Sequence, residues 1–289
     1  MEPGRIVSKK PLGPDVTMYW VFAPDIARRR KPGQFVIVRI AGQGERIPLT
    51  IADADPEAGT LSLVVQSVGK STRQMAMLEE GSSLQDIAGP LGTPTHIERF
   101  GTVICCGGGI GTAPLHPITQ ALHEAGNRVL TVLCARTAGL LVMVEEMGKV
   151  SDEVLVMTDD GSRGTKGLAT DGIRIVAGRV PAVDHAFVIG PPVMMKFASA
   201  VTRELGIPTT VSLNPIMIDG TGMCGCCRVT VGGRTRFACV DGPEFDGHQV
   251  DFDELMRRLS AYRDQERSAM EHFEGGCMLT GSGGHGSEG

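Results

Sequence analysis

The sequence predicts a small β-barrel, then a doubly wound parallel α/β sheet, then a short cysteine-rich domain. Short runs of β-forming residues separated by Gly/Pro turns fill residues 1–98, and strands alternate with helical segments over 99–210. Four cysteines lie within 211–250, a stretch too short to bury a hydrophobic core alone, so we expect a bound metal to stabilise it. A helix and a flexible Gly/Ser-rich tail are expected over 251–289.

Composition excludes several function classes. The formal net charge of -5 offers no broad attraction to phosphate backbones, and no long Lys/Arg run is present, so we expect no nucleic-acid partner. No stretch approaches the roughly 20 apolar residues that cross a bilayer, and the N-terminus has no apolar signal, so we expect no membrane association and a cytoplasmic protein. Eight cysteines would ordinarily stay reduced there, and their grouping indicates metal or redox use.

The barrel is predicted from three β-forming runs, over 34–40, 49–52 and 60–68. Ser71-Thr-Arg-Gln-Met-Ala-Met-Leu predicts one inserted helix. Gly89-Pro-Leu-Gly supplies the turn residues that close the region.

The second part begins with the strand Thr102-Val-Ile-Cys-Cys and a Gly-rich turn. Strands that alternate with helices are typical of a parallel, doubly wound sheet. The expected helices cover 112–126, 140–148, 166–178 and 192–205, and the strands between them cover 129–135, 153–157 and 185–189. In the cysteine-rich part, a Gly232-Gly turn predicts a β-hairpin, and one amphipathic helix is expected over about 251–271.

The strongest motif is Asp219-x4-Cys224-x2-Cys227-x11-Cys239. Its spacing is that of plant-type [2Fe–2S] loops, with an aspartate in the first cysteine's position, and carboxylate oxygen can bind iron. A zinc site or incidental reduced thiols are the alternatives. Cys226 is a second candidate for the fourth ligand, although side chains of adjacent residues diverge on a strand, which favours Asp219.

A second motif, Cys106-Gly-Gly-Gly-Ile-Gly-Thr-Ala-Pro114, joins a strand to a helix. Glycines there let a pyrophosphate approach the helix N-terminus, where free N–H groups and the helix dipole favour anions. A purely structural turn is the alternative, and the strands that follow favour dinucleotide binding. The candidate residues in the motif are Gly108, Gly109, Ile110, Gly111, Thr112, Ala113 and Pro114.

Further candidates follow later strands, where an open parallel sheet binds its ligand. Asp159, Asp160 and Gly161 follow one strand, and Gly190 and Pro191 follow the last; ordinary turn and helix-start chemistry explains both equally well. Arg136, near the end of the second strand, is suited to a 2′-phosphate or to capping the strand.

A third motif lies in the barrel. Arg46-Ile-Pro-Leu-Thr50 and Val64-Val-Gln-Ser-Val-Gly-Lys-Ser-Thr72 offer an Arg, a hydroxyl and a Gly before a helix, which suit contacts with a flavin ring and its diphosphate. Without further context, Arg46 is better explained as a solvated surface charge and Gly69 as a turn before a helix.

The order of these parts resembles the ferredoxin–NADP reductase superfamily. Gly107-Gly-Gly-Ile-Gly-Thr-Ala-Pro, Asp159-Asp-Gly-Ser and Cys239-Val-Asp-Gly-Pro-Glu-Phe are similar to the electron-transfer subunits of dihydroorotate dehydrogenase. The stretch Asp219-Gly-Thr-Gly-Met-Cys-Gly-Cys-Cys resembles the small subunits of NADH-dependent reduced ferredoxin:NADP oxidoreductases, also called sulfide dehydrogenases. The dihydroorotate-type subunits carry cysteine in the position of Asp219, so the resemblance favours the ferredoxin:NADP relatives.

The resemblance implies a FAD-binding barrel, an NAD(P)-binding α/β domain and a [2Fe–2S] domain, with NADH as the nucleotide. The residues that correspond to flavin contacts are Arg46, Pro48, Leu49, Thr50, Val64, Val65, Gln66, Gly69, Lys70, Ser71 and Thr72. Two departures stand out. Arg46 is one residue farther from Thr50 than the superfamily motif, and Ile189-Gly-Pro replaces the usual Cys-Gly-Pro, so no thiol is expected to work there.

The implied activity is electron transfer between NAD(H), FAD and the cluster, within a heterodimer. A larger flavin and iron–sulfur subunit would handle NADPH and ferredoxin in an electron-bifurcating complex. Hydride transfer to a flavin needs no side-chain acid or base, so no catalytic residue is predicted. A dihydroorotate-type electron-transfer subunit and a non-catalytic module that binds a nucleotide and a cluster are the alternatives.

Overall fold

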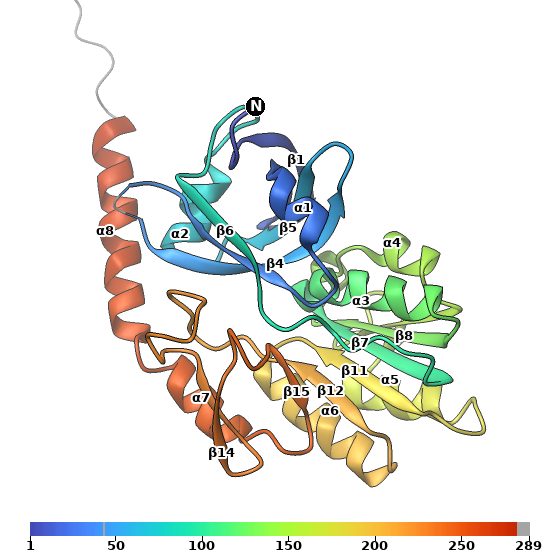
Figure 1. Cartoon of the computed structure of the whole chain (residues 1–289). Helices are drawn as coiled ribbons and strands as arrows, with labels where there is room; N and C mark the ends of the chain where they lie inside the picture. The colour runs from blue at the N-terminus through green and yellow to red at the C-terminus, as the bar shows by residue number, and fades with distance from the viewer. Residues whose placement is uncertain (43, 282–289) are drawn as a thin grey trace, which may run out of the picture.

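The computed structural model describes residues 1–42 and 44–281, with side chains described up to Glu274. The Gly/Ser-rich tail predicted at the C-terminus lies, beyond residue 281, outside the described residues. The chain forms a barrel, a large mixed sheet covered by helices on both faces, and a small hairpin domain (Figure 1).

The N-terminal part is an antiparallel sheet that curls toward closure, in the order β1-β2-β5-β4-β3-β6. Backbone hydrogen bonds join the start of β1 to the segment before β6, from Ile6 N to Ser82 O (2.8 Å) and from Leu84 N to Gly4 O (2.9 Å). Its strands are β1 (Ile6–Gly13), β2 (Val16–Phe22), β3 (Phe35–Arg39), β4 (Arg46–Asp55), β5 (Thr60–Gln66) and β6 (Asp86–Leu91), and its helices are α1 (Pro24–Arg29) and α2 (Lys70–Ala76). The predicted barrel is therefore confirmed.

The second part is a seven-stranded sheet in the order β10-β9-β8-β7-β11-β12-β15. Its neighbours run parallel except for β12 and β15, which are antiparallel. The strands are β7 (Thr102–Gly108), β8 (Arg128–Ala135), β9 (Glu153–Thr158), β10 (Thr165–Lys166), β11 (His185–Ile189), β12 (Thr209–Ser212) and β15 (Glu244–Asp246). Because β8 and β11 flank β7 on opposite sides, the chain reverses its direction of travel there, which makes a topological switch point.

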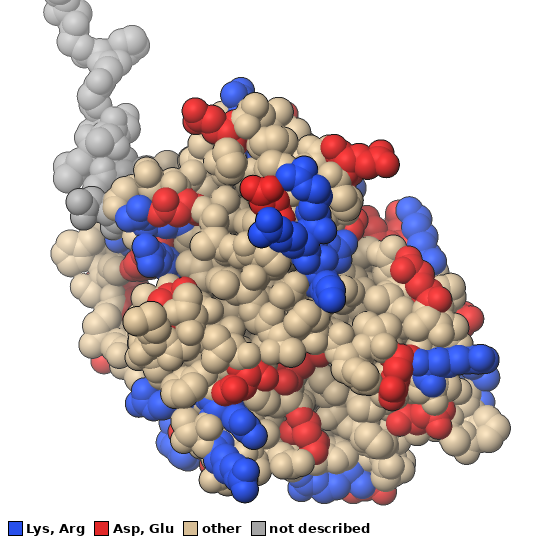
Figure 2. Space-filling model, in the orientation of Figure 1, with Lys and Arg blue, Asp and Glu red and all other residues tan. Residues whose placement is uncertain are grey.

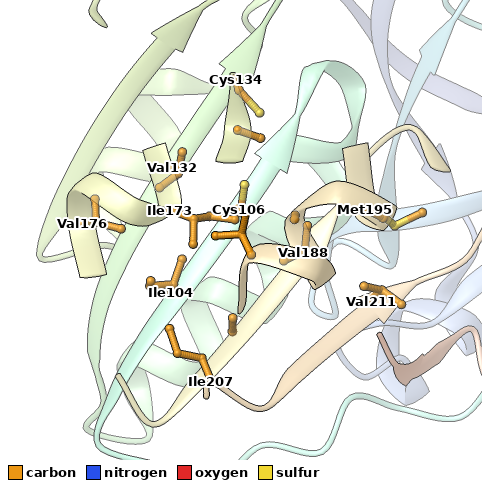
Figure 3. Close-up of a cluster of buried hydrophobic side chains, with 14 of the residues drawn as sticks. Ile104, Cys106, Val132, Cys134, Ile173, Val176, Val188, Met195, Ile207 and Val211 are labelled. Carbon is orange, nitrogen blue, oxygen red and sulfur yellow. The ribbon is translucent and has the colours of Figure 1, made fainter. Parts of the chain in front are cut away.

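Helices cover both faces of this sheet because its strands are apolar on both faces. On β7, Val103 and Cys105 face α3 (Thr112–Glu124) and α4 (Val144–Lys149). Ile104 and Cys106 face the other layer, formed by α5 (Ala169–Ala177), α6 (Pro192–Glu204) and α7 (Phe252–Leu259) (Figure 3). Two single 3-10 turns, η1 (Gly109–Gly111) and η2 (Ala138–Leu140), follow β7 and β8.

Two predicted helices begin later than expected. The helix predicted over 140–148 is α4, and it starts after Met143, whose left-handed backbone (φ 55°) is incompatible with a helix interior. The helix predicted over 166–178 is α5, because Thr165–Lys166 form the edge strand β10 and Gly167 (φ 148°) precedes the helix.

The hairpin domain consists of β13 (Arg228–Val231) and β14 (Arg234–Phe237), as predicted. The single helix predicted over 251–271 is wrong, because the chain forms α7 and then a separate helix, α8 (Arg263–Gly281). The hydroxyl of Ser260 donates to Arg257 O (2.8 Å), a local side-chain bond that competes with continued helix. α8 lies beside α2, joined by an ion pair between Arg73 and Glu274 (2.6 Å).

The surface in the orientation of Figure 1 carries both signs of charge, with one group of adjoining basic side chains over the region of α1 (Figure 2). Among the described residues, no helix combines the length and the apolar composition needed to cross a membrane.

Candidate functional site

Two glycine-containing turns meet at the switch point of the large sheet. A Cβ on Gly111, after β7, would lie 2.5 Å from Ile189 O and 2.8 Å from the Cα of Gly190, after β11. A Cβ on Gly190 would in turn lie 3.2 Å from the Cα of Gly108. The structure thus brings Gly190 against Gly108 and Gly111, which the sequence marked in a separate motif, and only glycine permits this approach.

The side chain of Met194 packs against both turns, and the sequence analysis did not name it as a site residue. A Cβ on Gly108 would lie 2.3 Å from Met194 Sδ, and one on Gly190 would lie 2.6 Å from Met194 Cε. The thiol of Cys134, on the neighbouring strand, lies 3.5 Å from the same sulfur. The signal was the run Gly190-Pro-Pro-Val-Met-Met, in which Pro191 is exposed and the first methionine, Met194, reaches back under the turn.

The open side of the β7–α3 turn is suited to an anion. Gly109 has a left-handed backbone (φ 53°), and a Cβ there would meet no atom within 4 Å. In the described part of the chain no side chain caps the N-terminus of α3, although Thr112 N donates to Gly109 O and Ile110 O of the preceding turn and Pro114 has no N–H. Thr112 and Ala113 are buried, whereas Ile110 and Pro114 are half-buried at the rim. A pyrophosphate fits this arrangement.

The loops that follow β8 and β9 lie together farther along the same edge. Asp160 N donates to Arg136 O (3.3 Å), and Ala138 N donates to the hydroxyl of Ser162 (2.8 Å). Asp160 Oδ1 accepts from the hydroxyl (2.6 Å) and the backbone N–H (2.9 Å) of Ser162, and these bonds lower the pKa of Asp160. Arg136, Asp159, Asp160 and Gly161 are all exposed, so this pair of loops presents both a cation and a carboxylate to a ligand.

In the barrel, the start of β4 lies against the start of α2. The buried hydroxyl of Ser71 donates to Glu45 Oε2 (2.6 Å), and Glu45 directly precedes the exposed Arg46 in the chain. A Cβ on Gly69 would meet no atom within 4 Å, so the turn before α2 is open. Along the strands, Val64 and Val65 are buried, and Pro48, Leu49, Thr50 and Gln66 are half-buried, as is Lys70 at the start of α2.

The hydroxyl of Thr72 has a local role. It accepts from the backbone N–H groups of Val68 (3.1 Å) and Gly69 (3.0 Å), and it donates to Gly69 O (2.9 Å). These bonds fix the turn that leads into α2. The contact of Thr72 with a flavin stays a prediction beside this local role.

The barrel and the nucleotide turn share one apolar cluster. Val64 of β5 and Ala52 of β4 pack with Ala113, in the first turn of α3. The residues predicted to contact flavin and those predicted to contact the nucleotide therefore meet in space, although about fifty positions separate them in the sequence. This junction allows two cofactors to lie next to each other.

The cysteine-rich loop connects β12 to β13. Gly220, Gly222 and Gly225 all have left-handed backbones, and a Cβ on Gly220 would lie 2.7 Å from Leu91 Cδ1 of the barrel. Cys227 and Cys239 are buried, with their sulfurs 3.2 Å apart. Burial raises the pKa of Cys239 to about 12, and the neighbouring Cys227 contributes to the rise as the second cause. A metal would therefore be needed to hold its thiolate.

The other two predicted ligands form a second pair. Asp219 accepts from the backbone N–H groups of Thr221 (2.9 Å) and Cys224 (2.8 Å), and the Thr221 bond contributes most to lowering the pKa of Asp219. Cys224 is exposed and also lies next to the half-buried Cys226. Within the described residues no three His, Cys, Asp or Glu side chains converge on one point. Donors arranged in pairs fit a [2Fe–2S] cluster, which takes two protein ligands at each iron.

Comparison with known proteins agrees with this arrangement. Residues 214–251 match the model of the iron–sulfur cluster binding domain of dihydroorotate dehydrogenase B. A Thermotoga maritima protein named "dihydroorotate dehydrogenase B (NAD(+)), electron transfer subunit homolog" is 51% identical over 269 residues, which cover 93% of this chain and 95% of the relative. The chain belongs to the family of dihydroorotate dehydrogenase B electron-transfer subunits and their homologues.

Solved structures place this family member in a wider fold group. A structure of the NADH-dependent reduced ferredoxin–NADP oxidoreductase, described for flavin-based electron bifurcation, is 49% identical, covers 94% of this chain and 98% of its own, and has a TM-score of 0.90. The ferredoxin reductase of a carbazole 1,9a-dioxygenase has a TM-score of 0.57 at 17% identity, covering 71% of this chain and 65% of its own, which shows a shared fold.

The family and the fold confirm several predictions from the sequence. The chain is an oxidoreductase subunit that transfers electrons, and FAD, a [2Fe–2S] cluster and NAD(H) are its cofactors. The resemblance to small subunits of ferredoxin:NADP oxidoreductases and the three-part fold class are confirmed as well. Electron-transfer subunits work within a larger complex, which agrees with the expected heterodimer.

Proposed function

We propose that the chain is the NAD(H)-reactive small subunit of an electron-bifurcating, NADH-dependent reduced ferredoxin:NADP oxidoreductase. The observation that supports this most is the pairing of Asp219 with Cys224, beside the pair of Cys227 and Cys239. An aspartate in this position is what the resemblance associates with the ferredoxin:NADP relatives. The 49% identity to the solved oxidoreductase supports the same choice.

Each predicted region has a proposed task. Residues 1–98 bind FAD, with the open turn at Gly69 and the N-terminus of α2 toward its diphosphate. Residues 99–210 bind NADH, with its pyrophosphate at Gly109 and the uncapped start of α3. Residues 211–250 hold the cluster through Asp219, Cys224, Cys227 and Cys239, and the helix of 251–289 extends from that domain.

The protein contributes binding and orientation rather than acid–base chemistry. FAD, when bound, supplies the conversion between two-electron transfer with NAD(H) and one-electron transfer with the cluster. Ala113 and Val64 hold the two binding regions in contact, and Met194 supports the turns from below. No side chain of this chain needs to move a proton for that exchange.

The proposed partner is a larger flavin and iron–sulfur subunit that handles ferredoxin and NADPH. The names of two relatives, from Thermotoga maritima and Methanopyrus kandleri, support a partner, since both are described as electron transfer subunits. Co-purification of the chain with its native partner, followed by iron, sulfide and flavin analysis, tests the assembly. A complex that contains a dihydroorotate-oxidising subunit instead would overturn the proposed partner.

The alternative is electron transfer for dihydroorotate oxidation, which the family model matched at residues 214–251 favours. The purified complex separates the two functions by its substrates. Reduction of NADP⁺ by NADH with reduced ferredoxin supports the proposal, and dihydroorotate-dependent reduction of NAD⁺ supports the alternative.

A further inference from the structure

Two arginines hold the segment between two of the proposed cluster ligands. Arg258 Nη2 donates to Cys226 O (3.1 Å), and Arg228 Nη1 donates to Gly225 O (3.1 Å). These carbonyls belong to consecutive residues that lie between Cys224 and Cys227. Both guanidinium groups are therefore anchored within one or two residues of the proposed ligands.

Neither positive charge is neutralised nearby. Among the described residues, neither Arg228 nor Arg258 forms an ion pair with a carboxylate. Arg228 is exposed, whereas Arg258 is half-buried between α7 and the loop. Because water and salt screen a half-buried charge less than an exposed one, Arg258 acts more strongly on its surroundings.

The fold fixes the position of Arg258. α7 begins with Asp251, whose Oδ1 accepts from Glu254 N (2.8 Å), and it buries Phe252 and Leu255 in the core that also contains Val229 of the hairpin. Residue 258 lies three positions after Leu255 and so projects from the same side of the helix, toward the hairpin. Its neighbour Arg257 is exposed and makes no side-chain bond to the loop among the described contacts.

We propose that Arg258, with a smaller contribution from Arg228, raises the reduction potential of the [2Fe–2S] cluster. The inference rests on the proposed placement of the cluster at Asp219, Cys224 and their paired cysteines. Reduction adds a negative charge at that position, so a positive charge fixed close by favours the reduced form. The hydrogen bonds to Cys226 O and Gly225 O also hold the backbone that carries Cys227 in place. Arg258 is a positioning residue for the redox reaction.

An anaerobic redox titration followed by EPR tests the proposal on the full chain. Arg258→Gln removes the charge and keeps an amide donor, whereas Arg258→Lys keeps the charge. Arg257→Gln is the matched control, because it removes the same charge from the same helix without touching the loop. Arg228→Gln measures the contribution of the exposed arginine to the potential. Iron and sulfide content and the g values show whether each variant still holds an intact cluster.

The expected result is a more negative midpoint potential in Arg258→Gln, corresponding to about a tenfold weaker reduction equilibrium, or about 59 mV for one electron. Arg228→Gln shifts in the same direction by less, and Arg258→Lys and Arg257→Gln stay near the wild type. Equal potentials in Arg258→Gln and Arg257→Gln overturn the proposal, as do equal shifts in Arg258→Gln and Arg258→Lys. If Arg258→Gln loses its cluster, the midpoint potential of Arg228→Gln decides: a more negative value supports the proposal, and an unchanged value overturns it.

The same titration separates this inference from the proposed function. A wild-type chain without a [2Fe–2S] signal contradicts the proposed cluster itself. A wild-type signal whose potential is indifferent to both arginines contradicts only the role given to them.

Discussion

Glu244 is a carboxyl group placed where all three parts of the chain meet. The hydroxyl of Thr95, in the segment between the barrel and the large sheet, donates to Glu244 Oε1 (2.7 Å). Two residues earlier, Thr93 N donates to Gly242 O (2.7 Å). Burial raises the pKa of Glu244 to about 7, the Thr95 bond lowers it slightly, and no charged side chain among the described residues contributes.

The raised pKa makes stability depend on pH with a definite sign. The folded chain keeps the proton on Glu244 up to about pH 7, whereas the unfolded chain loses it near the ordinary value of 4.5. The stabilisation is therefore fully present below pH 4.5 and is lost as pH rises through 7. At about 1.4 kcal/mol for each pH unit, the whole difference is roughly 3 kcal/mol, an upper bound because the residue retains some solvent exposure. About 2 kcal/mol of it falls between pH 5.5 and 8.

Glu244→Gln replaces the carboxyl group with a neutral group of the same shape that still accepts from Thr95. Urea unfolding followed by circular dichroism, at pH 5.5 and at pH 8, measures the free energy of unfolding of both proteins. The wild type should lose about 2 kcal/mol relative to Glu244→Gln between these pH values. Glu271→Gln, an exposed change on α8, serves as the control and should follow the wild type. If wild type and Glu244→Gln show the same dependence on pH, the reasoning about this junction is wrong.

Three further changes test other parts of the site. Gly111→Ala places a Cβ 2.5 Å from Ile189 O, so NADH binding, measured by calorimetry, should weaken at least tenfold, and unchanged affinity would contradict the close approach of the two turns. Thr72→Val removes the bonds from Val68 N and Gly69 N, so it should lower the free energy of unfolding in urea by about 1 kcal/mol and reduce the amount of FAD that the protein retains. If both quantities stay unchanged, the turn does not need this hydroxyl. Asp219→Cys should change the EPR spectrum of the cluster, and an unchanged spectrum would exclude Asp219 as a ligand in favour of Cys226.

The sequence predicted the elements whose signals are local. Alternating β-formers, the Gly-rich turn after Thr102–Cys106 and the Gly232-Gly hairpin each depend on a few neighbouring residues, and the structure has them where expected. The ends of elements were less predictable. Ser260 ends α7 through a side-chain bond to Arg257 O, and such a bond has no distinct periodic signal.

Features that depend on distant contacts could not be predicted. β15 joins the large sheet by pairing with β12, and nothing in Glu244-Phe-Asp indicates which strand it will meet. Met194 packs beneath Gly108, and Arg258 of α7 donates to Cys226 O of the cysteine-rich loop, and each contact joins residues tens of positions apart in the sequence. The glycines and cysteines of the site were predictable because their spacing in the sequence indicates their chemistry. The side chains that support them depend on tertiary packing, which the sequence pattern does not show.

Anaerobic addition of NADH to the purified chain tests most directly whether it transfers electrons from a nicotinamide through FAD to a [2Fe–2S] cluster. Visible absorption follows the flavin, and EPR at low temperature follows the reduced cluster in the same samples. The expected result is a flavin band that bleaches on addition of NADH, together with a growing [2Fe–2S] signal. A protein that purifies without flavin, or whose flavin band NADH leaves unchanged, would contradict the proposed function.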